Sequence, residues 1–398
     1  MKCARVNCSA IIAAVCLYST STSHAAIVFD DGGNHAYTGT NNDTLEVLDS
    51  NTNAPTTVAI NNGAVIGDDD TEEISVAVRG SSILFINGGT IGQDVDSFDN
   101  STVTMNGGYI DDDIHSEGSS TFNINGGTID DDANADDNST INMTGGNVGQ
   151  DFETRNNAKA FISGGTIGRD LISQNNGQTS FSGGTIEENF VALNKSTNNI
   201  SGGTINKHLF SFGDSEITVT DGTIKQNVAS DDDSTINISG GTVEGIVESY
   251  DFSTINISGG NFEDNITAVQ DSNINITGGT FENNIIAIHG AAITIEGGDI
   301  GVNNSANLVA EHLGNITIDG SNFKIDGVDV ALGEITDISG TLSGILADGS
   351  AFEIDFLREF APVPHNTVRG TITLIPEPAS LALLSLAGSL IFTRNRRA

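Results

Sequence analysis

An aspartate recurs at intervals of 19 residues through the first half of the chain. The members of this aspartate column are Asp94, Asp113, Asp132, Asp151 and Asp170. Carboxylates stacked at the spacing of neighbouring strands repel one another, and a bound cation would relieve that repulsion. Calcium is the natural cation because it prefers oxygen ligands. We therefore predict calcium at these five residues. The alternative is a structural turn ladder, since Asp and Asn tolerate left-handed backbone and hydrogen-bond within turns.

The same position in later repeats is mostly amide. Its occupants are Asn189, His208, Asn227, Ile246, Asn265, Asn284 and Asn303. Four histidines lie in the repeat region: His115, His208, His289 and His312. When the repeats are aligned with one another, these histidines occupy different columns. Histidines in separate columns do not make a metal-ligand set, so we expect none.

The same repeats bear on whether the chain is an enzyme. Many right-handed β-helices cut acidic polysaccharides, and such sites need carboxylates beside a Lys or Arg in a groove walled by long loops. The only basic cluster in the repeats is Arg155, Lys159 and Arg169, near Asp151 and Asp170. The repeats contain no insertion long enough to wall a cleft. We expect no enzymatic activity, and the alternative is a polysaccharide lyase or glycoside hydrolase of β-helix type.

The elements that must position these residues follow from the repeat. Gly-Gly or Asp-Gly pairs recur every 19 residues from Gly88 to Gly297, and the next step lengthens to 22, reaching Asp319. Fixed short periods indicate a solenoid. Apolar residues fall 3, 7, 15 and 17 positions after the start of each pair, and the last two alternate with polar residues, as in Ile236 and Ile238. Alternation with β-branched residues predicts strands.

The fold class we predict is all-β, a right-handed parallel β-helix of about 19-residue coils. The left-handed form would favour a period of 18, which the chain lacks. We expect a signal peptide over 1–25, a cap with irregular first coils over 26–80 and repeats over 81–345. Cap strands follow over 346–375, and 376–398 is a sorting signal with a terminal hydrophobic helix.

Charge restricts the partners. The chain has 53 acidic against 15 basic residues, for a net charge of −38. Binding a phosphate backbone needs clustered Lys and Arg, so we expect no nucleic-acid partner. Outward-facing threonine and asparagine ladders, such as Asn237 and Asn256, would suit an extracellular polysaccharide. The alternative is that any exposed β-face is rich in these residues.

The N-terminus has the pattern of a secretory signal peptide. Lys2 and Arg5 precede an apolar stretch, and small residues allow cleavage after Ala25 or Ala26. This predicts export by the Sec machinery. All three cysteines of the chain lie before the cleavage point, so we expect no disulfide in the mature protein.

The C-terminus combines three features in fixed order. Pro376, Glu377 and Pro378 are followed by an apolar stretch and then by a basic tail containing Arg394, Arg396 and Arg397. This resembles the PEP-CTERM sorting signal of Gram-negative bacteria, and the repeats resemble those of haemagglutinin-type adhesins. The resemblance implies transient inner-membrane insertion and cleavage by an exosortase. It also implies delivery to the cell surface or biofilm matrix, with an adhesive or structural role. The alternative is a plain membrane anchor.

Overall fold

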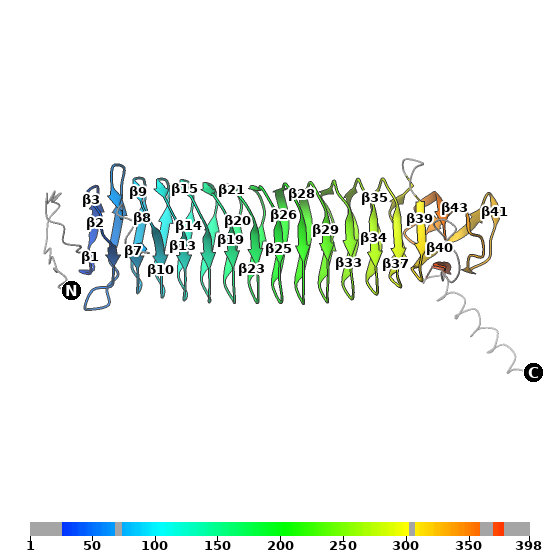
Figure 1. Ribbon diagram of the computed structural model, residues 1–398, viewed down its shortest axis with the longest axis horizontal. Coiled ribbons are helices and arrows are strands. Elements are labelled where there is room, and N and C mark those ends of the chain that lie inside the picture. Colours follow the sequence, from blue (N-terminus) through cyan, green and yellow to red (C-terminus); the bar gives the residue numbers. More distant parts are fainter. Residues whose placement is uncertain (1–25, 68–73, 302–306, 359–368, 378–398) are drawn as a thin grey trace, which may run out of the picture. The chain divides into compact units, whose positions relative to one another are not determined.

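The computed structural model describes residues 26–67, 74–301, 307–358 and 369–377. Ala25 and the predicted signal peptide lie outside these residues, as do Pro378, Arg394, Arg396, Arg397 and the predicted sorting helix. The chain divides into two compact units, Met1–Lys207 and His208–Ala398. Each unit consists of stacked β-coils, which confirms the predicted parallel β-helix (Figure 1). No helix in the described ranges has the length and apolarity needed to cross a membrane.

Each regular coil contributes strands to three columns, which we name A, B and C. In the first unit, column A contains β2 (Asn34–Tyr37), β5 (Thr57–Ile60), β8 (Ile83–Ile86), β11 (Thr102–Met105), β14 (Thr121–Ile124), β17 (Thr140–Met143), β20 (Lys159–Ile162), β23 (Gln178–Phe181) and the start of β26 (Thr197–Ile205). Column B contains β3 (Thr40–Asn41), β6 (Val65–Ile66), β9 (Thr90–Ile91), β12 (Tyr109–Ile110), β15 (Thr128–Ile129), β18 (Asn147–Val148), β21 (Thr166–Ile167), β24 (Thr185–Ile186) and the end of β26. Column C contains β1 (Ile27–Phe29), β4 (Leu45–Val47), β7 (Ile74–Val78), β10 (Asp94–Ser97), β13 (Ile114–Ser116), β16 (Ala133–Ala135), β19 (Phe152–Thr154), β22 (Leu171–Ser173) and β25 (Phe190–Ala192).

The second unit repeats this plan. Column A contains β28 (Glu216–Ile224), β30 (Thr235–Ile238), β33 (Thr254–Phe262), β35 (Asn273–Phe281), β37 (Ala292–Ile295), β40 (Asn315–Ile325) and β45 (Thr371–Pro376). Column B contains β31 (Thr242–Val243), β38 (Asp299–Ile300) and the ends of β28, β33 and β35. Column C contains β27 (Leu209–Ser211), β29 (Val228–Ser230), β32 (Val247–Ser249), β34 (Ile266–Val269), β36 (Ile285–Ile288), β39 (Asn307–Glu311) and β44 (Ala351–Leu357).

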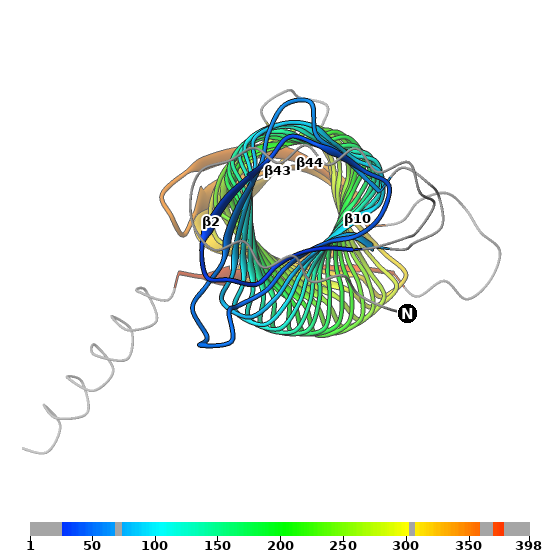
Figure 2. The same cartoon turned by 90° about the vertical axis from the view of Figure 1, so that its left-hand side faces the viewer.

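Neighbouring coils pair in parallel with equivalent residues in register. Val95 of β10 pairs with Ile114 of β13, and Val103 of β11 pairs with Phe122 of β14. The coils are of the right-handed type, and Figure 2 views them from the end at which the N-terminal coils lie. In-register stacking places identical side-chain types above one another, and this fixes which columns face inward.

The core consists of the columns that the sequence predicts. In one coil the inward residues Ile110, Ile114, Phe122 and Ile124 are all 0% exposed. Buried serines lie at the corners of the coil. Ser230 Oγ lies 2.7 Å from Ser234 Oγ, and Ser234 Oγ also donates to the Ser211 carbonyl at 2.9 Å. The corner is therefore polar but hydrogen-bonded, as a buried hydroxyl requires.

The last regular coil is longer than the sequence alignment indicates. Ile295 pairs with Ile318, a step of 23 residues, so the predicted step of 22 to Asp319 is wrong and Gly320 is the equivalent of Gly297. The extra residues lie in the connection between β38 and β39. The repeat motif does not extend into this connection, so it could not fix the alignment there.

The C-terminal end changes to antiparallel pairing. β43 (Ser339–Leu346) pairs antiparallel with β40 and β44, whereas β45 pairs parallel with β40. Two short strands complete this end, β41 (Val328–Asp329) and β42 (Gly333–Glu334). β44 and β45 are the strands predicted there, and they cover backbone edges that would otherwise be open.

Candidate functional site

The aspartate column is a hydrogen-bonded ladder between coils. Asp94 Oδ1 accepts from the backbone N–H of Asp113 at 3.0 Å, and Asp113 Oδ1 accepts from that of Asp132 at 2.7 Å. The same bond joins Asp151 to Asp132 at 2.8 Å, Asp170 to Asp151 at 3.0 Å and Asn189 to Asp170 at 2.9 Å. One carboxylate oxygen of each aspartate is thus committed to the backbone of the next coil.

The equivalent positions of the second unit show which property of the side chain matters. His208 Nδ1 accepts from the Asn227 N–H at 3.2 Å, and Asn227 Oδ1 accepts from the Ile246 N–H at 3.2 Å. Ile246 has no acceptor, and the N–H of Asn265 is bound instead by Asp264 Oδ1 at 2.7 Å. Aspartate, asparagine and histidine have one property in common here: each offers a side-chain atom that accepts a hydrogen bond from the next coil. Sequence reasoning compared their charges and missed this.

The residues that directly precede the members of the aspartate column form a second column. After the first coils, the side chains of this second column pair with one another across neighbouring coils. Arg169 Nη1 donates to Gln150 Oε1 at 3.0 Å, Gln150 donates to Asp131, and Lys207 Nζ lies 2.8 Å from Glu188 Oε1. Asp112 instead converges with other carboxylates. Asp112, Asp113 and Asp131 have ligand atoms within 4.8 Å of one another. Burial, followed by Asp113 and Asp131, raises the pKa of Asp112.

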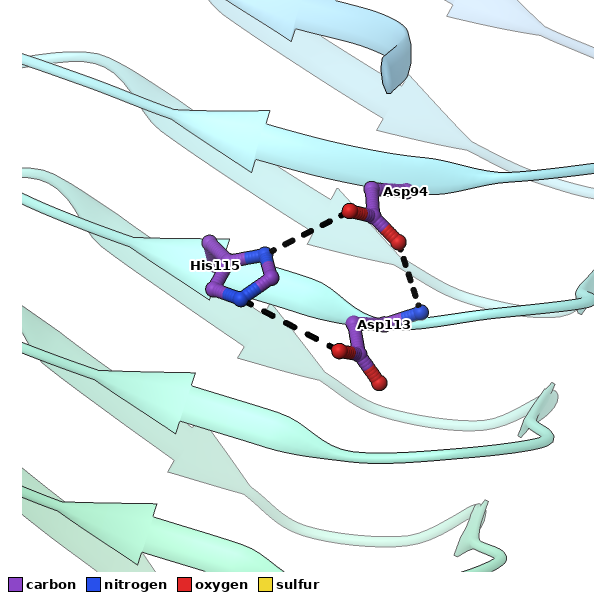
Figure 3. Close-up of side chains that lie close together, drawn as sticks. All are labelled: Asp94, Asp113 and His115. Atoms are coloured by element: carbon purple, nitrogen blue, oxygen red, sulfur yellow. Dashed lines mark hydrogen bonds and ion pairs between the residues drawn. The ribbon is translucent and has the colours of Figure 1, made fainter. Parts of the chain in front are cut away.

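A second group forms around His115, on β13. Its Nδ1 lies 3.8 Å from Asp94 Oδ2, and its Nε2 lies 4.0 Å from Asp113 Oδ2 (Figure 3). The same Nδ1 lies 3.2 Å from Asp96 Oδ1. Asn134 Nδ2 lies 3.5 Å from the same Nε2. These residues meet because Asp96, His115 and Asn134 pair in register in column C. Asp94, Asp113 and His115 have ligand atoms within 4.8 Å of one another.

Burial and contacts within this group shift the pKa values of Asp94 and His115. Burial raises the pKa of Asp94 to about 6, although the Asp113 N–H and His115 act in the opposite direction. A hydrogen bond to Asp96 raises the pKa of His115, against the effect of its own burial. Two of the five side chains are deeply buried, since Asp96 and Asn134 are each 6% exposed.

The structure therefore separates the predicted calcium ligands. Asp94 and Asp113 join groups of three metal-ligating side chains, whereas Asp132, Asp151 and Asp170 join none within the described ranges. Sequence reasoning did not place His115 beside the aspartate column, but it lies next to Asp94 and Asp113, because residues two positions apart on adjacent coils converge. His289 and His312 also share a column, with ring centroids 5.2 Å apart. The 23-residue step brings them into line.

Two members of the predicted basic cluster are engaged in ion pairs. Arg155 pairs with Glu153, and Arg169 Nε lies 3.8 Å from Asp151 Oδ1. A depression in the C-terminal region is lined by residues that include Phe323, Lys324 and Pro376 and by none of the cluster. Nothing in the geometry of Arg155, Lys159 and Arg169 places them around a groove.

The outward face of column A carries amide ladders. Asn256 donates to Asn237 Oδ1 at 2.8 Å and Asn275 donates to Asn256 Oδ1 at 2.9 Å. In the first unit, Asn142 donates to Asn123 Oδ1 at 2.9 Å, and Phe161 two coils beyond Asn123 is 49% exposed. A flat polar face with an exposed aromatic ring offers stacking and hydrogen bonding together.

Of the predicted processing residues, Pro376 and Glu377 are described. Pro376 is the last residue of β45, and Glu377 Oε1 accepts from Ser321 Oγ at 3.0 Å. Comparison with family models, with curated proteins and with solved structures gave no match to this chain.

Proposed function

We propose that this chain is an exported β-helix protein that acts as a structural or adhesive component of the cell surface or extracellular matrix. The observation that supports it best is the regular register within each unit, from β11 to β23 in the first and from β27 to β36 in the second. In-register coils of one length present continuous polar ladders such as Asn237, Asn256 and Asn275. A repeated surface of this kind binds a repeated ligand, and an extracellular polysaccharide has a matching repeat.

Export and sorting rest on the two terminal patterns. The chain passes through the Sec machinery, and an exosortase cleaves it near Pro376, Glu377 and Pro378. Pro376 ends the last described strand, so cleavage there leaves the coils whole. Replacing the three residues by alanine should hold the protein in the membrane fraction of the host. Normal release of that variant would contradict the sorting proposal.

Calcium binding along the aspartate column belongs to the same proposal. Each aspartate uses Oδ1 on the backbone of the next coil, which leaves Oδ2 to face a hydrated cation. Millimolar calcium should raise the melting temperature of the protein, and replacing Asp132, Asp151 and Asp170 by asparagine should reduce that increase. Asparagine keeps the ladder, so an unchanged response to calcium would remove the column as its site.

The alternative of a polysaccharide lyase or hydrolase makes a different prediction. Such an enzyme shortens its polymer, and a binding protein does not. Incubation with matrix polysaccharide followed by size-exclusion chromatography separates the two, and shortening that Arg169→Gln abolishes would establish the enzyme.

A further inference from the structure

Three strands of column C bring an imidazole, three carboxylates and an amide to one spot. Asp96 of β10, His115 of β13 and Asn134 of β16 are register partners on successive coils. Asp94 and Asp113 flank them, and all five side chains lie in the first unit. Asp94 and Asp113 are held in place independently, because each accepts a backbone N–H from the next coil. The site is therefore built on strands and a fixed ladder rather than on a loop.

The two ring nitrogens of His115 have different surroundings. Nδ1 lies 3.2 Å from Asp96 Oδ1, and Asp96 is 6% exposed. A buried carboxylate beside one nitrogen fixes the ring orientation and leaves the other nitrogen to ligate a metal, an arrangement common among metal-binding histidines. The remaining nitrogen, Nε2, lies 4.0 Å from Asp113 Oδ2. That oxygen is not the one used in the ladder.

Asn134 supplies an independent sign of a missing ligand. Its side chain is 6% exposed, and its Oδ1 has no hydrogen-bond partner among the described residues. Buried polar atoms are normally paired. Its Nδ2 lies 3.5 Å from His115 Nε2, so a half-turn of the amide would bring the unpaired oxygen to the side of Nε2. An ion at Nε2 would satisfy that oxygen.

We propose that His115 and Asp113 bind a divalent transition-metal ion of the zinc class, with Asp94 and the Asn134 amide completing the site and Asp96 orienting the imidazole. Imidazole favours zinc and its neighbours over calcium, which takes oxygen ligands only. Zinc–ligand distances of about 2.0–2.2 Å mean that the ligand atoms, now within 4.8 Å of one another, close by about 1 Å. This site does not depend on the proposed function.

The test uses the full chain in mild detergent, stripped of metal by a chelator. Zinc binding is measured by calorimetry, and Co²⁺ is used as a spectroscopic probe of the coordination. The starting protein carries His289→Gln and His312→Gln, which removes the other imidazole pair. His115→Gln and Asp113→Asn should each weaken zinc binding at least ~10-fold. Asp113→Asn keeps a ladder acceptor, as Asn227 and Asn284 do in their coils, so it tests charge without breaking the fold.

Two matched variants are controls. His208→Asn removes a histidine that accepts the Asn227 N–H and stacks on Phe210, and Glu153→Gln changes the carboxylate one coil beyond Asn134. Both should bind zinc within about twofold of the starting protein, a margin far below the ~10-fold expected at the site. Equal zinc affinity in His115→Gln and the starting protein would overturn the proposal. Calcium displacing zinc at equal concentration would also overturn it.

Discussion

The backbone N–H of Asp132 donates to Oδ1 of Asp113, which lies 19 positions earlier in the chain, at 2.7 Å. This bond repeats along the column and explains its composition. The residue before each column C strand has an N–H that the strand ladder does not use, and a buried N–H without a partner is costly. A side-chain acceptor in the preceding coil supplies the partner, so charge is incidental to this role.

The ladder predicts different outcomes for two replacements of Asp132. Asp132→Ala removes the acceptor for the Asp151 N–H and should lower the free energy of unfolding by about 1–2 kcal/mol. Asp132→Asn keeps the acceptor and removes a partly buried charge whose pKa is raised by burial, so stability should be unchanged or higher. Urea denaturation measures both variants. Equal losses would show that the carboxylate charge, and not the acceptor, matters.

The break in the column at Ile246 predicts a rescue. Asp264→Ala should lower the free energy of unfolding by about 1 kcal/mol, because the Asn265 N–H loses its partner. Adding Ile246→Asn should restore part of this loss, since the new amide stands where Asn227 stands one coil earlier. The double-mutant cycle in thermal denaturation gives the coupling. Additive effects would contradict the ladder at this coil.

A buried carboxylate predicts a pH dependence of stability. Asp319 is 4% exposed, and its pKa is raised by burial first and then by Glu296 and Glu377. Because the folded-state pKa lies above the unfolded value, ionisation opposes folding, and stability falls as the pH rises from the unfolded pKa through the folded pKa. Asp319→Asn should remove this fall and raise stability at pH 7 by on the order of 1 kcal/mol. Parallel pH profiles for the two proteins would contradict it.

The second glycine of each pair predicts a steric effect. Gly127 has φ +93°, and an added Cβ would lie 2.9 Å from the Gly108 carbonyl oxygen. Gly349 has φ +92° with nothing within 4 Å. Gly127→Ala should cost about 2–4 kcal/mol and Gly349→Ala about 1–2 kcal/mol, since only the first adds a clash to the backbone strain. Similar melting temperatures for the two variants would mean that coil stacking tolerates a methyl group.

The fold could be read from the sequence because its determinants repeat. Inward residues such as Ile110 and Phe122 recur at fixed offsets, and period-2 alternation identifies strands without knowledge of contacts. The length of the insertion before β39 was underestimated by one residue, because Asp319-Gly320 resembles the usual glycine pair. Only the register of Ile295 with Ile318 corrects it.

The candidate site was less accessible to sequence reasoning. The aspartate column was visible, but its partner is a backbone N–H, which a sequence does not display. His115 was set aside because its column holds no other histidine, yet its neighbours come from two columns and three coils. In a solenoid, residues at offsets of 2, 19 and 21 can all be neighbours, and a search around His115 at these offsets would have found Asp113, Asp96 and Asp94.

We propose that the chain binds an extracellular polysaccharide without cutting it. Purified protein should be mixed with matrix polysaccharide of the host, with calcium or with chelator, and followed by co-sedimentation and by polymer length. The account predicts co-sedimentation that calcium strengthens and a polymer of unchanged length. Shortening of the polymer, or no co-sedimentation under either condition, would contradict it.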